Sequence, residues 1–177
     1  IHFVRETGDL LGIKITDAEN DAIDADFSDL TFNNISIRNA GNDCFDVSES
    51  VVELKALIAR KVKDKGISAG ENSKVRVESV NLKGVGIGLV SKDGSELLVD
   101  NLIITDTKLP LSTFIKKAEY DDPILSVDKI TADDRISALK SFGSKLTVPN
   151  YVNVKELRSS EIESQMYGAK YGVETQK

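Results

Sequence analysis

The sequence predicts an all-β fold: a right-handed parallel β-helix, a solenoid with about 22 residues per coil and a short C-terminal helical cap. Three observations predict it. One apolar pattern returns at a nearly constant interval along the chain. Within each interval, apolar and polar residues alternate as they do in short strands. Val, Ile and Leu must supply the packing, because aromatic residues make up only 6% of the chain and Trp is absent.

Each copy of the pattern follows a serine or proline and places apolar side chains at positions +2, +4, +7 and +9. Complete copies follow Ser28, Ser50, Ser73, Ser95 and Pro123, and Ser144 starts a sixth copy that fades at Asn153. A unit this short cannot bury its apolar face alone, so successive copies must stack. The serines occupy a turn, where their hydroxyl groups can satisfy local backbone donors.

Each unit contains three short strands. The first covers residues 22–25 and its counterparts 44–47, 66–69 and 88–91. Alternation turns Ile23 and Ala25 inward and leaves one column facing outward: Asp24, Asp46, Ser68 and Val90. The second strand carries positions +2 and +4, and the third carries +7 and +9, with a bend between them. Equivalent strands then lie parallel, and their crossover connections are right-handed.

Both ends and one interval depart from the regular repeat. Residues 113–123 lengthen the interval that leads to the fifth copy, at Pro123. The loop carries Phe114, Lys116, Lys117 and Tyr120, which could contact a sugar or a partner, and the alternative is an insertion without a function. Ser160 and Glu163 predict the capping box of a helix that covers the final coil. We therefore expect a β-helix over residues 1–154 and a cap and tail over 155–177. Because the chain begins inside a repeat, we also expect further N-terminal coils.

Composition limits the possible partners and chemistry. The formal net charge is −6 and the pI is about 4.9, which opposes binding to the phosphate backbone of nucleic acid. No stretch approaches the length of a transmembrane helix, so no membrane insertion is expected. The chain has one cysteine, Cys44, and one histidine, His2. A disulfide framework, a multi-cysteine metal site and histidine chemistry in the body of the domain are therefore excluded.

Stacking turns sequence columns into candidate sites. Asp21, Asp43 and Lys65 share one column just before the first strand, and Asp24 and Asp46 share a second. Carboxylates about 5 Å apart perturb each other's pKa, which suits acid–base chemistry or a Ca²⁺ ion. The alternative is that these acids only cover an exposed face. No cofactor is expected beyond that possible Ca²⁺.

The repeats resemble the pectin-lyase-like parallel β-helices between Leu10 and about Val154. Within them, residues 20–24, 41–44 and 65–68 are similar to the polygalacturonase motifs N-T-D, G-D-D and G-H-G. The resemblance implies acid–base roles for Asp21 and Asp43 and uronate binding by Lys92. Three positions depart from the motifs, with Asn42 in place of an aspartate, Lys65 of a histidine and Val90 of an arginine. An amide cannot protonate a leaving group.

Other segments resemble the generic β-helix repeats of large bacterial surface-associated proteins, namely residues 64–71 and 88–94. Two functions follow. The first is a non-catalytic scaffold or binding module that presents an acidic face, with Asp24, Asp46, Phe114 and Tyr120, to a polysaccharide or protein partner. The second is a polysaccharide-active lyase, epimerase or hydrolase that uses Asp21, Asp43, Lys65 and Lys92. The resemblance favours the cell envelope or the extracellular space.

Overall fold

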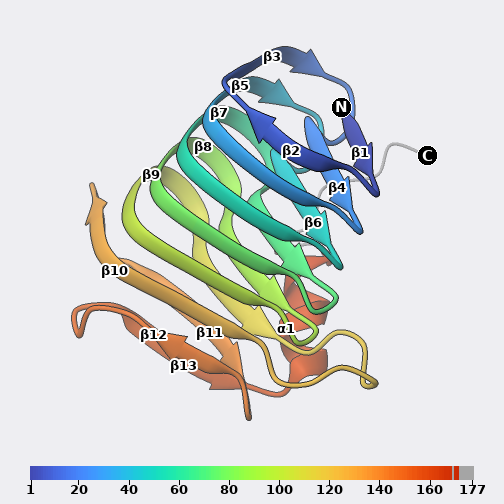
Figure 1. The fold of residues 1–177 in the computed structure, drawn as a ribbon. Coiled ribbons are helices and arrows are strands. Elements are labelled where there is room, and N and C mark those ends of the chain that lie inside the picture. The colour runs from blue at the N-terminus through green and yellow to red at the C-terminus, as the bar shows by residue number, and fades with distance from the viewer. Residues whose placement is uncertain (169, 172–177) are drawn as a thin grey trace.

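The computed structural model describes residues 1–168, 170 and 171 and confirms a parallel β-solenoid of about seven turns (Figure 1). Of the expected cap and tail, residues 169 and 172–177 lie outside the described residues. The elements in chain order are β1 (His2–Val4), β2 (Thr7–Leu10), β3 (Ile13–Ala18), β4 (Ile23–Asp26), β5 (Asp29–Ala40), β6 (Phe45–Ser48), β7 (Val51–Gly70), β8 (Lys74–Lys92), β9 (Glu96–Phe114), β10 (Ile124–Ala132), β11 (Ser137–Ser141), β12 (Lys145–Thr147), β13 (Asn153–Leu157) and α1 (Ser159–Met166).

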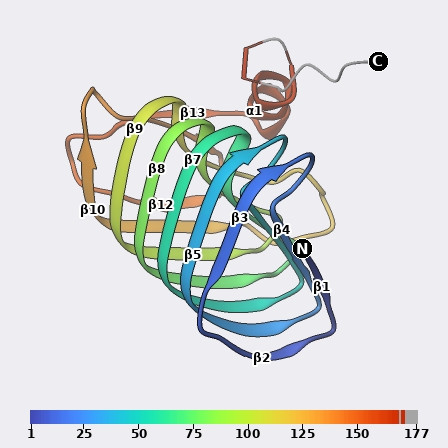
Figure 2. The same cartoon turned by 90° about the horizontal axis from the view of Figure 1, so that it is seen from above.

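The strands stack into three parallel faces, which appear as nested coils when the molecule is seen from above (Figure 2). The first face begins with β1, β4 and β6, the second with β2, and the third with β3. β7, β8 and β9 are long because each continues through the bends and contributes to all three faces. Most paired residues are 22 apart, as in His2 with Asp24 and Ile23 with Phe45.

The predicted columns are confirmed by the pairing register. Leu30 pairs with Val52, and the column continues through the equivalent residues Val75, Leu97, Leu125 and Leu146. The first-strand column is fully buried and lines the interior with Ile23, Phe45, Ile67, Leu89 and Leu111. The core is thus a stack of aliphatic layers with few aromatic rings, as the composition requires.

The coil turns sharply at two columns of residues with left-handed backbone conformation. One lies between the third and the first strand, at Asp17, Asn39, Lys61, Gly84 and Asp106. The other lies between the first and the second strand and includes Phe27, Glu49 and Asp93. Asn, Asp and Gly tolerate this conformation best, so the repeat keeps them at the first corner in four of five coils. Asn39 Nδ2 also donates to Asp17 Oδ1 at 2.5 Å, which links two coils there.

The serine column forms a hydrogen-bonded ladder along the solenoid axis. Ser28 N donates to Ser50 Oγ at 2.9 Å, Ser50 N to Ser73 Oγ at 3.2 Å, and Ser73 N to the next serine at 3.1 Å. The prediction that these hydroxyl groups satisfy backbone donors is confirmed, but the expectation that the donors are local is wrong. The donors belong to the preceding coil, however, so the serines join coils as well as shape turns.

The C-terminal helix is confirmed, and it packs on the outer side of the first face, where it contacts β11 near the end of the stack. Ile162 and Met166 of α1 form a second apolar cluster on the outer side of the first face. The strand residues of this cluster are Ile87, Val90, Leu109, Phe114 and Leu139. Val90, which we expected to face solvent, is consequently fully buried, and Ser68 in the same column is fully buried as well. The capping box also differs, since Glu161 Oε2 accepts from Arg158 N at 3.0 Å and the helix begins at Ser159.

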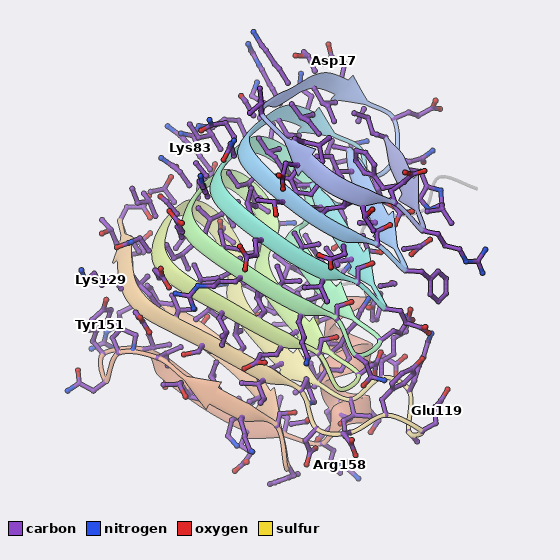
Figure 3. All side chains as sticks on the ribbon, in the orientation of Figure 1. Asp17, Lys83, Glu119, Lys129, Tyr151 and Arg158 are labelled. Carbon is purple, nitrogen blue, oxygen red and sulfur yellow. The ribbon has the colours of Figure 1, made fainter. Side chains whose placement is uncertain are left out.

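Strand pairing continues past residue 154, because β13 pairs in parallel with β11 up to Leu157. Figure 3 shows Arg158, which follows this strand, at the bottom of the stack beside α1. Within the described residues, no helix has the length and apolar content needed to cross a membrane.

Candidate functional site

The predicted residues Asp43 and Lys65 meet in a buried ionic cluster with Asp64. Lys65 Nζ lies 3.2 Å from Asp43 Oδ1 and 2.5 Å from Asp64 Oδ2. The three residues are only 3–7% exposed. One ammonium group thus faces two carboxylates, and the cluster carries a net charge of −1 when all three groups are ionised. Asp64 Oδ1 is also buried and has no hydrogen-bond partner among the described residues.

The turn before the first strand positions this cluster by repeating one hydrogen bond from coil to coil. Asp21 Oδ1 accepts from Asp43 N at 2.8 Å, and Asp43 Oδ1 accepts from Lys65 N at 2.9 Å. Asn42 Nδ2 donates to the same Asp21 oxygen at 2.8 Å. Each aspartate therefore holds the backbone of the next coil, and Asp21 is joined to the cluster through the ladder.

The C-terminal segment covers the cluster from outside. Tyr167, which ends α1, places its ring 5.3 Å from Lys65 Nζ and 4.7 Å from Lys116 Nζ. Cations over an aromatic face are attracted by its negative electrostatic potential. Further along the same column, Ile87 and Leu109 replace the charged residues and pack against α1. The cluster thus lies at the margin of the helix contact.

Burial and charge perturb both partners. Burial raises the pKa of Asp43, and Asp64 and Asp46 raise it further against the opposing attraction of Lys65, to about 7. Burial alone lowers the pKa of Lys65, but attraction to Asp43 and Asp64 outweighs it and holds this pKa above its usual value. Protonation of Asp43 would also remove the net negative charge of the cluster, which adds to the effect of burial.

Lys92 does not join the other three predicted catalytic residues. Its side chain lies beside Gly70, and it interacts with Glu71. Lys65 pairs with Ile87, and Lys92 is five residues further along that strand, roughly 16 Å away at the usual rise. The expected convergence of Asp21, Asp43, Lys65 and Lys92 is therefore wrong for Lys92. A two-residue motif transferred from another family could not fix its place along the strand.

The insertion loop differs from expectation at Phe114, which is fully buried at the end of β9 under α1. It cannot contact a ligand in this structure. Lys117 forms an ion pair with Glu71, and the backbone amides of Lys116 and Lys117 donate to Asp93 Oδ1 at 2.6 and 2.7 Å. Tyr120 stays partly exposed, 6.0 Å from Lys117 Nζ. Glu119 of this loop projects away from the stacked coils (Figure 3).

Asp24 and Asp46 lie in register on the outer side of the first face and are partly exposed, as predicted. Burial raises the pKa of Asp24, and Asp26 adds to this effect. Among residues 1–168, 170 and 171, three candidate metal ligands approach one another at a single place, and this group contains His2 with Asp24 and Asp26. An imidazole is not a ligand that Ca²⁺ favours. The Ca²⁺ site therefore stays a prediction.

An open groove of about 640 Å³ follows the corner between the third and the first strand. Its polar lining carries both signs of charge and comes from successive coils, with Asp17, Glu19, Asn39, Lys61, Lys63 and Asp106. Figure 3 shows Asp17 projecting from the upper end of the solenoid. The same turns lead directly into the ladder from Asp21 to Lys65, so the groove and the ionic cluster adjoin.

Sequence reasoning missed three residues of these sites. Asp64 adjoins Lys65 in sequence, but it lies at a register irregularity between Val62 and Lys65. The regular repeat does not predict this irregularity. Tyr167 lies outside the repeat, and nothing in the sequence indicates where α1 docks. His2 could have been found, because it precedes Asp24 by one repeat and pairs with it.

Comparison of the chain with family models, with curated proteins and with solved structures found no match. The structure shows the parallel β-solenoid, and the pectin-lyase-like relationship remains a resemblance of motifs.

Proposed function

We propose that the chain is a non-catalytic β-helix module, a rigid scaffold that binds an extended polysaccharide along its side as part of a surface- or polysaccharide-associated protein. The observation that carries this proposal is the state of Lys65. Its ammonium group is buried and held between Asp43 and Asp64, and Tyr167 lies over it. A general base needs an unprotonated amine with access to substrate. The raised pKa of Lys65 opposes the first requirement, and its burial opposes the second.

The corner groove is the surface best suited to the ligand. It continues along the axis at the strand spacing of about 4.8 Å, so an extended chain can contact several successive coils. Lys61 and Lys63 are exposed and can pair with the carboxylates of a uronate-containing glycan. Asp17, Glu19 and Asn39 can exchange hydrogen bonds with its hydroxyl groups.

Affinity electrophoresis in gels that contain polygalacturonate or alginate tests the proposal. We expect the parent chain to be retarded and Lys61→Ala/Lys63→Ala to migrate as in a gel without glycan. Lys83→Ala/Lys129→Ala removes the same charge from exposed positions outside the groove lining and serves as the matched control. If both double variants lose retardation equally, the net charge of the chain explains the binding, and a defined site in the groove is contradicted.

One observation favours the alternative, a polysaccharide-active enzyme. Asp43 has its pKa raised to about 7, the range in which a carboxylic acid can donate a proton at neutral pH. In this alternative Tyr167 must move aside to expose Asp43 and Lys65. Product formation from a glycan panel decides between the two. Turnover that is abolished by Asp43→Asn and by Lys65→Met, in folded variants, would establish the enzyme.

A further inference from the structure

Three potential metal ligands lie together on the outer side of the first two coils. His2 on β1 pairs directly with Asp24 on β4, and Asp26 follows two residues along β4, so alternation puts all three side chains on the same face. His2 Nε2 lies 2.8 Å from Asp26 Oδ2 and 3.5 Å from Asp24 Oδ2. The three ligand atoms fit within 4.8 Å of one another. The group is partly exposed and so can be reached from solvent.

These separations suit Zn²⁺. Zinc binds imidazole nitrogen and carboxylate oxygen at about 2.0–2.2 Å in tetrahedral geometry, which places neighbouring ligand atoms roughly 3.3 Å apart. The two measured separations from His2 lie on either side of this value, so small rotations of the side chains would complete the site. The mixture of one nitrogen and two oxygens also distinguishes the group from the oxygen-only ligand sets of Ca²⁺ and Mg²⁺.

The backbone under the site is held in place independently of the three side chains. Phe3, next to His2, points inward, and its ring packs edge to face on Phe32 at 5.9 Å between centroids. The pairing of β1 with β4 fixes the register, so His2 cannot slide relative to the two aspartates. In the next coil Asp46 pairs with Asp24, and its buried Oδ1 has no hydrogen-bond partner among the described residues. A further unsatisfied carboxylate therefore adjoins the group.

We propose that His2, Asp24 and Asp26 form a Zn²⁺ site with three protein ligands and a fourth position open to water or to a ligand carboxylate. This inference is independent of the proposed glycan-binding function, because the corner groove shares no residue with the site. The chain offers no competing soft ligand, since His2 is its one histidine and Cys44, its one cysteine, is fully buried.

Calorimetric titration of the untagged, metal-free chain with zinc chloride tests the site. We expect one Zn²⁺ per chain. The affinity should fall by about tenfold or more in each of the variants His2→Ala, Asp24→Asn and Asp26→Asn. Asp29→Asn removes an exposed carboxylate from the same coil and should bind as the parent does. Circular dichroism in EDTA checks that the variants fold, which is expected because the three side chains are partly exposed.

A second readout identifies the ligand atoms. Because the chain has a single histidine, its imidazole proton resonances report on His2 alone. They should shift on addition of Zn²⁺ and stay unchanged on addition of Ca²⁺. Absence of binding, binding that survives Asp24→Asn and Asp26→Asn, or equal competition by Ca²⁺ would each overturn the proposal.

Discussion

Replacement of Lys65 by methionine tests the buried cluster most sharply, because it removes the charge and keeps much of the side-chain volume. In the parent, the ammonium group contacts Asp43 and Asp64, both buried. Without it, two carboxylates face each other in a site of low polarity. Removal of one partner from a buried ion pair costs about 3–5 kcal/mol, since the remaining charge is left uncompensated. We expect the free energy of unfolding to fall by this amount at pH 8.

The loss should depend on pH in a defined direction. Asp43 can relieve the repulsion by taking up a proton, and its pKa in the parent is already raised to about 7. The destabilisation should therefore shrink as pH falls from 8 toward 5. Urea denaturation followed by circular dichroism measures it at both pH values. Lys63→Met, an exposed lysine two residues earlier on the same turn, should change stability by less than about 0.5 kcal/mol. The triple variant Lys65→Met/Asp43→Asn/Asp64→Asn should recover part of the loss. If Lys65→Met costs no more than Lys63→Met at pH 8, the cluster does not hold the coils as described.

Three further predictions concern the ladder, the cluster and the helix contact. Ser50→Ala removes the acceptor of the Ser28 amide and should lower the free energy of unfolding by about 1–3 kcal/mol, whereas the exposed Ser36→Ala should be neutral in the same urea titration. Because the pKa of Asp43 rises from 3.8 in the unfolded chain to about 7 in the folded one, its contribution to stability is fully present below pH 4 and is lost as pH rises to 7. Asp43→Asn should flatten this fall in stability between pH 4 and 7, and an unchanged slope would assign it to other groups. Phe114→Ala empties a fully buried position under α1 and should lower the free energy of unfolding by about 3–5 kcal/mol. Amide hydrogen exchange should then be faster in Ser159–Met166 than in the strands. Equal exchange rates in the helix and the strands would contradict separate docking of the helix.

The solenoid could be predicted because the length of one coil equals the interval at which the apolar pattern recurs in the sequence. Leu30 and Val52 occupy equivalent places in two copies of the pattern and pair in the structure. The same spacing brought Asp43 and Lys65 together correctly, since both precede the first strand by the same interval. Stacking places the residues at equivalent positions of successive coils in register.

The remaining features depend on contacts that do not repeat. Val90 and Phe114 face outward but are buried, because α1 folds back over that side. The repeat pattern does not indicate where a terminal helix docks. The motif that suggests a role for Lys92 does not specify its position along the strand, where it lies five residues beyond the partner of Lys65. Asp64 owes its place in the cluster to a local register irregularity in one coil.

Product analysis of a uronate-containing glycan panel incubated with the chain distinguishes a binding module from an enzyme, with binding measured in parallel on the same glycans. We expect retention by at least one of these polysaccharides through Lys61 and Lys63, with no change in its length, unsaturation or epimer composition. Binding should persist in Asp43→Asn. Glycan conversion by the parent that disappears in Asp43→Asn and in Lys65→Met would refute the non-catalytic module and make the buried cluster an active site.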